Sequence, residues 1–154
     1  MGTKKARRHM LWGSAMLLAC LVAGCGGDSV GPDPSVALLV GDWDATRVVL
    51  TSVANPQVKP ELIALGAAFR LNIQPSGQYT AILLYAAQSS TEIGTLSVSG
   101  NTVTMKRNFP TLATSAALFA LEGNHLTLDG DSEFDFNLDG TPEPALAHFE
   151  LLRR

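Results

Sequence analysis

Residues 69–85 read FRLNIQPSGQYTAILLY and carry the clearest structural signal in this chain. The residues of one apolar face stand at every second position on both sides of Pro75-Ser76-Gly77: Phe69, Leu71, Ile73, Tyr79, Ala81, Leu83 and Tyr85. Alternate side chains of a β-strand share one face, and Pro, Ser and Gly are typical of a tight turn. The stretch therefore predicts a β-hairpin with one apolar face.

The same period of two continues on both sides of this hairpin. Further strands are expected at 40–50, 93–99, 103–105, 126–128, 134–138 and 145–153, with turns at Gly100-Asn101, Glu122-Gly123-Asn124 and Asp139-Gly140. The apolar segment 111–121 has alanines at helical spacing, but the turn after it favours a third hairpin. We expect an all-β domain of eight to nine strands, arranged as a small antiparallel up-and-down β-barrel. An open β-sandwich is the alternative.

One segment departs from the strand pattern. Within 56–66, Pro60 suits the first position of a helix, Glu61 suits its N-terminal turn and Gly66 suits its end. A short helix is therefore predicted after the first strand.

The N-terminus has the three parts of a secretory signal peptide. A basic start is followed by the apolar run 11–24, which is shorter than the roughly 20 residues that a membrane-spanning helix needs. The run ends in Val22-Ala23-Gly24-Cys25, which resembles the lipobox of bacterial lipoproteins, where the cysteine is acylated. The resemblance implies that residues 1–24 are a signal peptide and that Cys25 receives lipid.

Cys20 follows a loosely similar segment, Leu17-Leu18-Ala19. Cys25 is preferred because the next residues, 26–35, are rich in Gly, Pro, Ser and Asp, the composition of a flexible spacer. We expect a lipid-anchored tether over 25–37 and the barrel over 38–154. In lipoproteins of this kind, a residue other than aspartate after the cysteine, here Gly26, accompanies sorting to the outer membrane. The expected location is the bacterial envelope, at the periplasmic face of the outer membrane.

Charge and cysteine content limit which partners are expected for the chain that remains after removal of residues 1–24. The sequence has 11 Lys and Arg and 14 Asp and Glu, but four basic residues lie within the first eight positions, which leaves seven basic against 14 acidic. This balance argues against nucleic acid as a partner, and the acylated cysteine supplies the membrane affinity. Both cysteines lie at or before residue 25, so the domain has no disulfide and no thiolate nucleophile.

Two short motifs resemble those of lipocalins and lipocalin-like bacterial lipoproteins. Gly41-Asp42-Trp43 resembles the Gly-x-Trp of that family's first strand, and Arg153 or Arg154 resembles the arginine that stacks near this tryptophan. The likeness covers nearly all of 38–154. It implies an eight-stranded barrel with Trp43 plugging one end and a small lipophilic ligand in the mouth.

Four residues are the candidates for contacting such a ligand: Trp43, Tyr79, Tyr85 and Arg153. The tyrosines are included because each combines an apolar body with a polar tip. The alternative is a barrel filled by its own side chains, which would serve as a structural or protein-interaction module without a ligand.

Residues 135–140, Asp-Phe-Asn-Leu-Asp-Gly, match the start of a calcium-binding loop. Oxygen-bearing side chains at alternate positions, followed by glycine, let a chain curl round a hard cation. The twelfth position, where a bidentate glutamate is expected, is Leu146. The candidate calcium ligands are Asp135, Asn137, Asp139 and Glu143; the alternative is a plain β-turn at Asp139-Gly140.

The sequence shows no catalytic arrangement. His125 and His148 are far apart and have no cysteine to complete a zinc site. No serine lies in a Gly-x-Ser-x-Gly motif, and no glycine-rich phosphate loop follows a strand. A non-enzymatic protein without a required cofactor is predicted.

Overall fold

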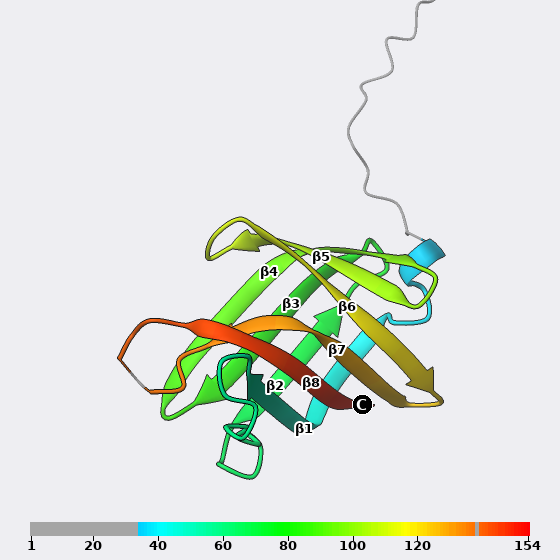
Figure 1. Ribbon diagram of the computed structural model, residues 1–154. Coiled ribbons are helices and arrows are strands. Elements are labelled where there is room, and N and C mark those ends of the chain that lie inside the picture. The colour runs from blue at the N-terminus through cyan, green and yellow to red at the C-terminus, as the bar shows by residue number, and fades with distance from the viewer. Residues whose placement is uncertain (1–33, 138) are drawn as a thin grey trace, which may run out of the picture.

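The computed structural model describes residues 34–137 and 139–154, whose strands close into one antiparallel barrel (Figure 1). A 3₁₀ turn, η1 (Pro34–Val36), precedes eight strands: β1 (Gly41–Ser52), β2 (Ala68–Ile73), β3 (Gln78–Tyr85), β4 (Gln88–Ser99), β5 (Thr102–Phe109), β6 (Ala113–Glu122), β7 (His125–Phe134) and β8 (Glu143–Arg153). Each strand pairs with the next in sequence, and β8 pairs with β1. The predicted up-and-down barrel is confirmed. The predicted signal peptide, Cys25 and most of the tether lie outside the described residues.

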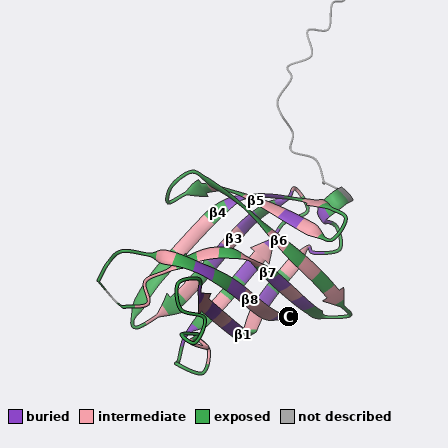
Figure 2. Ribbon diagram, viewed as in Figure 1, coloured by how far each residue is buried: buried purple, intermediate pink, exposed green. Residues whose placement is uncertain are grey.

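The barrel has a closed end and an open end. The turns 74–77, 100–101 and 123–124 lie at the closed end with η1, and the connections 53–67, 86–87, 110–112 and 135–142 lie at the other end. Buried residues gather along the inner face, as Figure 2 shows in purple. Both hydrophobic clusters of the described residues lie within 36–151, so this part of the chain carries a hydrophobic core.

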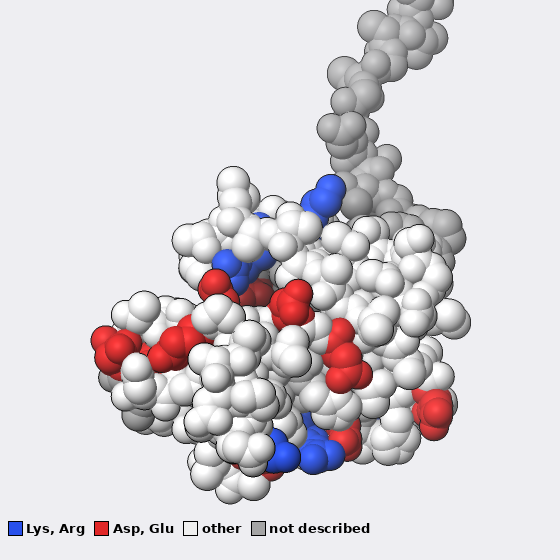
Figure 3. Space-filling view, in the orientation of Figure 1, with Lys and Arg blue, Asp and Glu red and all other residues white. Residues whose placement is uncertain are grey.

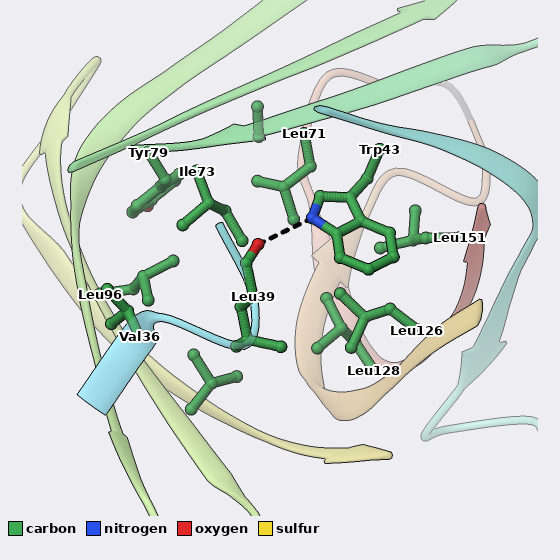
Figure 4. Packing of buried hydrophobic residues seen from close by; sticks show 12 residues of the cluster. Val36, Leu39, Trp43, Leu71, Ile73, Tyr79, Leu96, Leu126, Leu128 and Leu151 are labelled. Atoms are coloured by element: carbon green, nitrogen blue, oxygen red, sulfur yellow. Dashed lines mark hydrogen bonds between the residues drawn. The ribbon is translucent and has the colours of Figure 1, made fainter. Parts of the chain in front are cut away.

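Trp43 closes one end of the barrel. Its side chain is fully buried, and the indole Nε1 donates a hydrogen bond of 2.9 Å to the carbonyl oxygen of Leu39 (Figure 4). The Arg153 guanidinium carbon lies 4.4 Å from the ring centroid, an arrangement that the resemblance implied. Val36 is also fully buried in this cluster, so the packed domain begins before residue 38.

The predicted helix between the first two strands is wrong. Residues 62–66 form turns, and Glu61 forms an isolated bridge to Val49. Backbone hydrogen bonds join Leu50 to Pro60, Ser52 to Val58 and Leu62 to Val48. The physical reason is that β1 pairs with β2 only over 41–44. The rest of that β1 edge has unpaired backbone groups, and the connection satisfies them better in extended form.

The Glu61 carboxylate reinforces this connection. It accepts hydrogen bonds from the backbone N–H groups of Val48, Ile63 and Ala64 at 3.0, 3.0 and 2.7 Å. These bonds, led by that of Val48, lower the pKa of Glu61. Glu61, which the sequence places at the start of a helix, thus links the connection between β1 and β2 to the backbone of β1.

Of two other predictions from the sequence, one is confirmed and one is wrong. Residues 113–122 form strand β6, as the hairpin interpretation requires. The separate strand predicted at 134–138 is wrong, because β7 runs without a break from His125 to Phe134 and the following residues form a connection. Phe134 and Phe136 instead make an edge-to-face ring contact at 5.1 Å. Among residues 34–137 and 139–154, no helix has the length and apolar character needed to cross a bilayer.

Candidate functional site

The open half of the barrel encloses a cavity of about 730 Å³. Its apolar lining comes from strands on every side, chiefly Val48, Leu50, Phe69, Leu71, Leu83, Met105, Leu128 and Phe149. The open half of the barrel therefore contains space that its own side chains do not fill, whereas the closed end is packed. A volume of this size lies within the range of about 300–1,000 Å³ that is usual for small-molecule sites.

The cavity exists because small residues line one part of the wall. The inner surface of β6, β7 and β8 near the opening includes Ala113, Ala117, Gly130 and Ala147. At the closed end the inward positions hold large side chains such as Trp43, Leu126 and Leu151, which pack together. The difference in side-chain volume along the barrel leaves space at one end and fills the other.

Three polar side chains from adjacent strands face this apolar space. Tyr79 on β3, Glu92 on β4 and Arg107 on β5 all line the cavity. Nη1 of Arg107 donates a hydrogen bond of 2.7 Å to Oε1 of Glu92. Arg107 also donates from Nε to the Thr111 carbonyl oxygen at 2.9 Å and from Nη2 to Thr111 Oγ1 at 3.2 Å. The guanidinium is thereby held in one orientation beside the carboxylate.

Gly94 allows these side chains to come together. It pairs with Tyr79 on one side and Arg107 on the other, next to a register shift between β4 and β5. A Cβ atom at position 94 would lie 2.8 Å from Cε1 of Tyr79 and 2.1 Å from the backbone oxygen of Lys106. The Tyr79 ring therefore occupies the space that a side chain at residue 94 would need.

Burial raises the pKa of the Tyr79 hydroxyl, and the charge of Glu92 raises it further, while Arg107 lowers it. The hydroxyl is therefore protonated at neutral pH and can donate or accept a hydrogen bond. Together the three side chains present hydrogen-bonding groups of both kinds to a molecule inside the barrel.

The barrel wall has a gap between β6 and β7 beside this cavity. The two strands pair only from Ala117↔Gly130 to Glu122↔His125. Beyond that point, residues 113–116 pair with β5 alone, and residues 131–134 pair with β8 alone. A hollow of about 360 Å³ on this side shares Ala116, Ala117, Gly130 and Asp131 with the cavity lining. In Figure 3, acidic and basic side chains meet in the recess beside this part of the barrel.

The structure separates the four predicted ligand-binding residues. Tyr79 lines the cavity, whereas Trp43 and Arg153 belong to the closed end and are not among the lining residues. Arg153 donates hydrogen bonds of 2.7 Å to the carbonyl oxygens of Val40 and Leu38, so it ties the N-terminal segment to the barrel. Tyr85 is also outside the lining; its ring lies 6.1 Å from that of Phe134, which does line the cavity. Trp43 and Arg153 therefore have a structural role.

Sequence reasoning missed Glu92 and Arg107. A signal was present, because Glu92 is in phase with inward-facing Leu96, and Arg107 is in phase with inward-facing Val103. A charged residue in the inward phase of a barrel strand is unusual, since burial of a charge is unfavourable unless it is paired. Such positions are worth noting in the sequences of other barrels.

The predicted calcium ligands lie in the connection after β7, and their oxygens bond the connection itself. The Asp135 carboxylate accepts hydrogen bonds from the N–H groups of Asp139 and Gly140, at 3.1 and 2.7 Å. Asp139 accepts one from Thr141 N–H at 2.8 Å, and Glu143 accepts one from Phe136 N–H at 2.9 Å. Within the described ranges, no three His, Cys, Asp or Glu side chains form a group able to hold a metal. The calcium site stays a prediction of the motif.

His148 lies on the outer face of β8 between two carboxylates. Its Nδ1 is 2.6 Å from Oδ1 of Asp129, and its Nε2 is 3.3 Å from Oε1 of Glu150. Glu150 also pairs with Arg47 at 3.0 Å. The hydrogen bond to Asp129, followed by that to Glu150, raises the pKa of His148 above its ordinary value of 6.5.

This cluster predicts a pH dependence of stability. A raised pKa in the folded state means that the stabilisation is complete below the ordinary value and is lost as pH rises through the folded-state value. Between about pH 6 and about pH 8, the native protein should therefore lose stability relative to His148→Gln. The loss should stay below about 1 kcal/mol, since the groups are partly exposed and screened. Urea unfolding of both proteins at both pH values measures it; a gain with rising pH would contradict the prediction.

The fold and the cavity define a class: a closed, eight-stranded antiparallel β-barrel with internal space for a small molecule. A solved structure described as EF1p2_mFAP2b bound to DFHBI is similar, with a TM-score of 0.50 and 15% sequence identity over 78% of this chain and 97% of that one. At this identity the likeness shows the fold. No family model matches the sequence, and no curated protein matches it.

Proposed function

We propose that this chain is a lipid-anchored protein of the bacterial envelope whose lipocalin-like barrel binds a small lipophilic molecule. The observation that carries the proposal is the cavity of about 730 Å³ inside the barrel, whose lining combines a majority of apolar residues with several polar ones. Burying an apolar ligand there would be favourable at roughly 25 cal/mol for each Å² removed from water. The similar barrel described as bound to DFHBI supports small-molecule binding as a use of this architecture.

The position of the tether fits this role. The chain enters the barrel at the closed end (Figure 1). There, Ser35 Oγ accepts a hydrogen bond of 3.5 Å from the N–H of Val98. An anchor at Cys25 would thus hold the end opposite to the cavity opening and leave the opening accessible. The proposed location is the periplasmic face of the outer membrane, with the membrane as partner through the acyl chains.

We further propose that the protein acts by binding and not by catalysis. The cavity lining among the described residues includes no histidine or lysine, and the Tyr79 hydroxyl is held protonated by the rise of its pKa. The site thus favours holding a molecule over taking a proton from it.

A larger side chain in the cavity should weaken binding. Leu83 on β3 lines the cavity, and its neighbour Leu84 faces outward and is 48% exposed. Leu83→Trp should weaken binding of the neutral fluorescent probe N-phenyl-1-naphthylamine by about tenfold or more, equivalent to about 1.4 kcal/mol. The measurement is a fluorescence titration of the chain from Gly26 onward.

The matched control is Leu84→Trp, which adds the same side chain on the outside and should bind the probe as the native chain does. Equal binding by all three proteins would place the probe elsewhere and count against a cavity function. Absence of binding by the native chain would count against the proposal itself.

The anchor has a separate test. In the full chain produced in a bacterium with two membranes, Cys25→Ser should lose metabolic labelling by palmitate and fractionate away from mature lipoproteins, because acylation needs the thiol. Cys20→Ser should be labelled like the native chain. Labelling of Cys25→Ser together with loss of label in Cys20→Ser would assign the lipid to Cys20.

A further inference from the structure

Tyr79 has a hydroxyl without a protein partner inside the cavity. The residue is only 2% exposed and belongs to the lining, yet its oxygen makes no hydrogen bond with any residue in 34–137 or 139–154. The oxygen is not among the fully buried polar atoms that lack a partner, so it is open to the cavity and a bound molecule can reach it. This hydroxyl is therefore the natural point for a polar group of a bound molecule.

The charged groups around the entrance to the cavity are mostly acidic. Glu92 and Arg107 face the interior, whereas Asp131 and Glu133 share the outward phase of Asp129 on β7 and lie at the outer rim of the gap. Arg107 already donates to Glu92 and twice to Thr111. Within the described part of the chain, the side chains of Asp131 and Glu133 take part in no hydrogen bond or ion pair. A positive group that approaches the cavity through the gap would pass these two unpaired carboxylates.

We propose that the ligand is an amphiphile with a protonated amine head, whose apolar part fills the barrel and whose head lies against the Tyr79 hydroxyl and the Glu92 carboxylate. This inference rests on the proposed function and adds the chemical class of the ligand. An ammonium group can donate to the Tyr79 oxygen and to Glu92 Oε2, while the acidic gap between β6 and β7 attracts it.

An anionic head group fits the same site poorly. It could reach only the two N–H groups of Arg107 that Glu92 and Thr111 leave free, and it would lie beside the negative charge of Glu92 and compete with it for Arg107. Loss of one partner of a partly buried ion pair is unfavourable because the remaining charge is left without compensation. The intact Glu92–Arg107 pair therefore selects against carboxylates such as fatty acids.

The test compares head groups on one apolar chain. Decylammonium, decanoate and 1-decanol are titrated as competitors of bound N-phenyl-1-naphthylamine. The protein is the chain that begins at Gly26, and each competitor stays below the concentration at which it forms micelles. Decylammonium should displace the probe at a concentration about tenfold lower than decanoate. Ammonium ion without the alkyl chain should not displace it, since the apolar cavity supplies the affinity.

Two variants test the named groups. Glu92→Gln leaves Arg107 without its partner, so the preference for decylammonium over decanoate should fall about tenfold or reverse. Tyr79→Phe removes only the hydroxyl and should weaken decylammonium by about fivefold. The control, Glu122→Gln, removes a carboxylate at the closed end and should keep the native preference. Circular dichroism of each variant checks whether it folds like the native chain.

The outcomes separate this inference from the function on which it rests. Decanoate competing as well as decylammonium, while the probe still binds in the cavity, would overturn the amine head and keep the lipophilic site. The same follows if Glu92→Gln and Tyr79→Phe both leave the preference unchanged. A native chain that binds neither probe nor decyl compounds would overturn the proposed function as well.

Discussion

Trp43→Ala should lower the free energy of unfolding by about 3–5 kcal/mol. The indole is fully buried at the closed end. Its removal leaves a cavity, because the large side chains around it cannot shift enough to fill the space. It also leaves the Leu39 carbonyl without its 2.9 Å hydrogen bond and Arg153 without the ring 4.4 Å away. Urea unfolding measures the loss. It should be followed by far-ultraviolet circular dichroism and not by tryptophan fluorescence, because Trp43 is the only tryptophan beyond residue 12 and the variant lacks it.

The control lies in the same segment. Leu38 is 67% exposed, so Leu38→Ala should change stability by about 0.5 kcal/mol or less. Trp43→Phe should fall between the two, since it keeps an aromatic ring and loses the Nε1 donor. A loss below about 1 kcal/mol for Trp43→Ala would show that the closed end does not depend on this residue.

Gly94→Ala is expected to destabilise the barrel by about 3 kcal/mol or more, at or above the upper end of the usual effect of overpacking. The added Cβ would lie 2.1 Å from the backbone oxygen of Lys106 and 2.8 Å from the Tyr79 ring. A neighbouring backbone cannot rotate away as a flexible side chain can. Strands β4 and β5 must therefore separate where they pair, and the Glu92–Arg107 pair should be disturbed with them.

Gly100→Ala is the matched control. Gly100 has a φ of +60°, and no atom lies within 4 Å of the place that an added Cβ would occupy, so its substitution should cost about 1 kcal/mol from backbone strain alone. Chemical unfolding gives both values, and probe titration shows whether Gly94→Ala also loses binding. Equal losses for the two variants would contradict the steric role of Gly94.

Local pattern predicted the strands where the chain folds back on itself at once. The alternation in 69–85 and the turn at Pro75–Gly77 appear in the structure as β2 and β3 with the register Ile73↔Tyr79. The turn between β3 and β4 was not predicted in the same way. Ala86 and Ala87 adopt φ values of +50° and +62°, which alanine rarely takes, so no residue preference marks the turn. The paired strands on both sides impose it.

The site was only partly predictable. Tyr79 was found from its place on an apolar strand face, but Trp43 and Arg153, equally prominent in the sequence, lie at the end away from the cavity. Sequence pattern shows which side chains face inward and does not show at which level of the barrel they lie. That level depends on the stagger between strands, which closure of the whole sheet sets.

The sequence by itself determined the all-β class, the alternation of inward and outward positions and the turns marked by glycine, because each depends on residues close together in the chain. Only the tertiary structure decided that residues 58–62 pair with β1 instead of forming a helix, that β6 and β7 separate at the open end, and that Glu92 meets Arg107. Each of these depends on backbone groups or charges brought together from distant positions. Their interactions exist only after the barrel has closed.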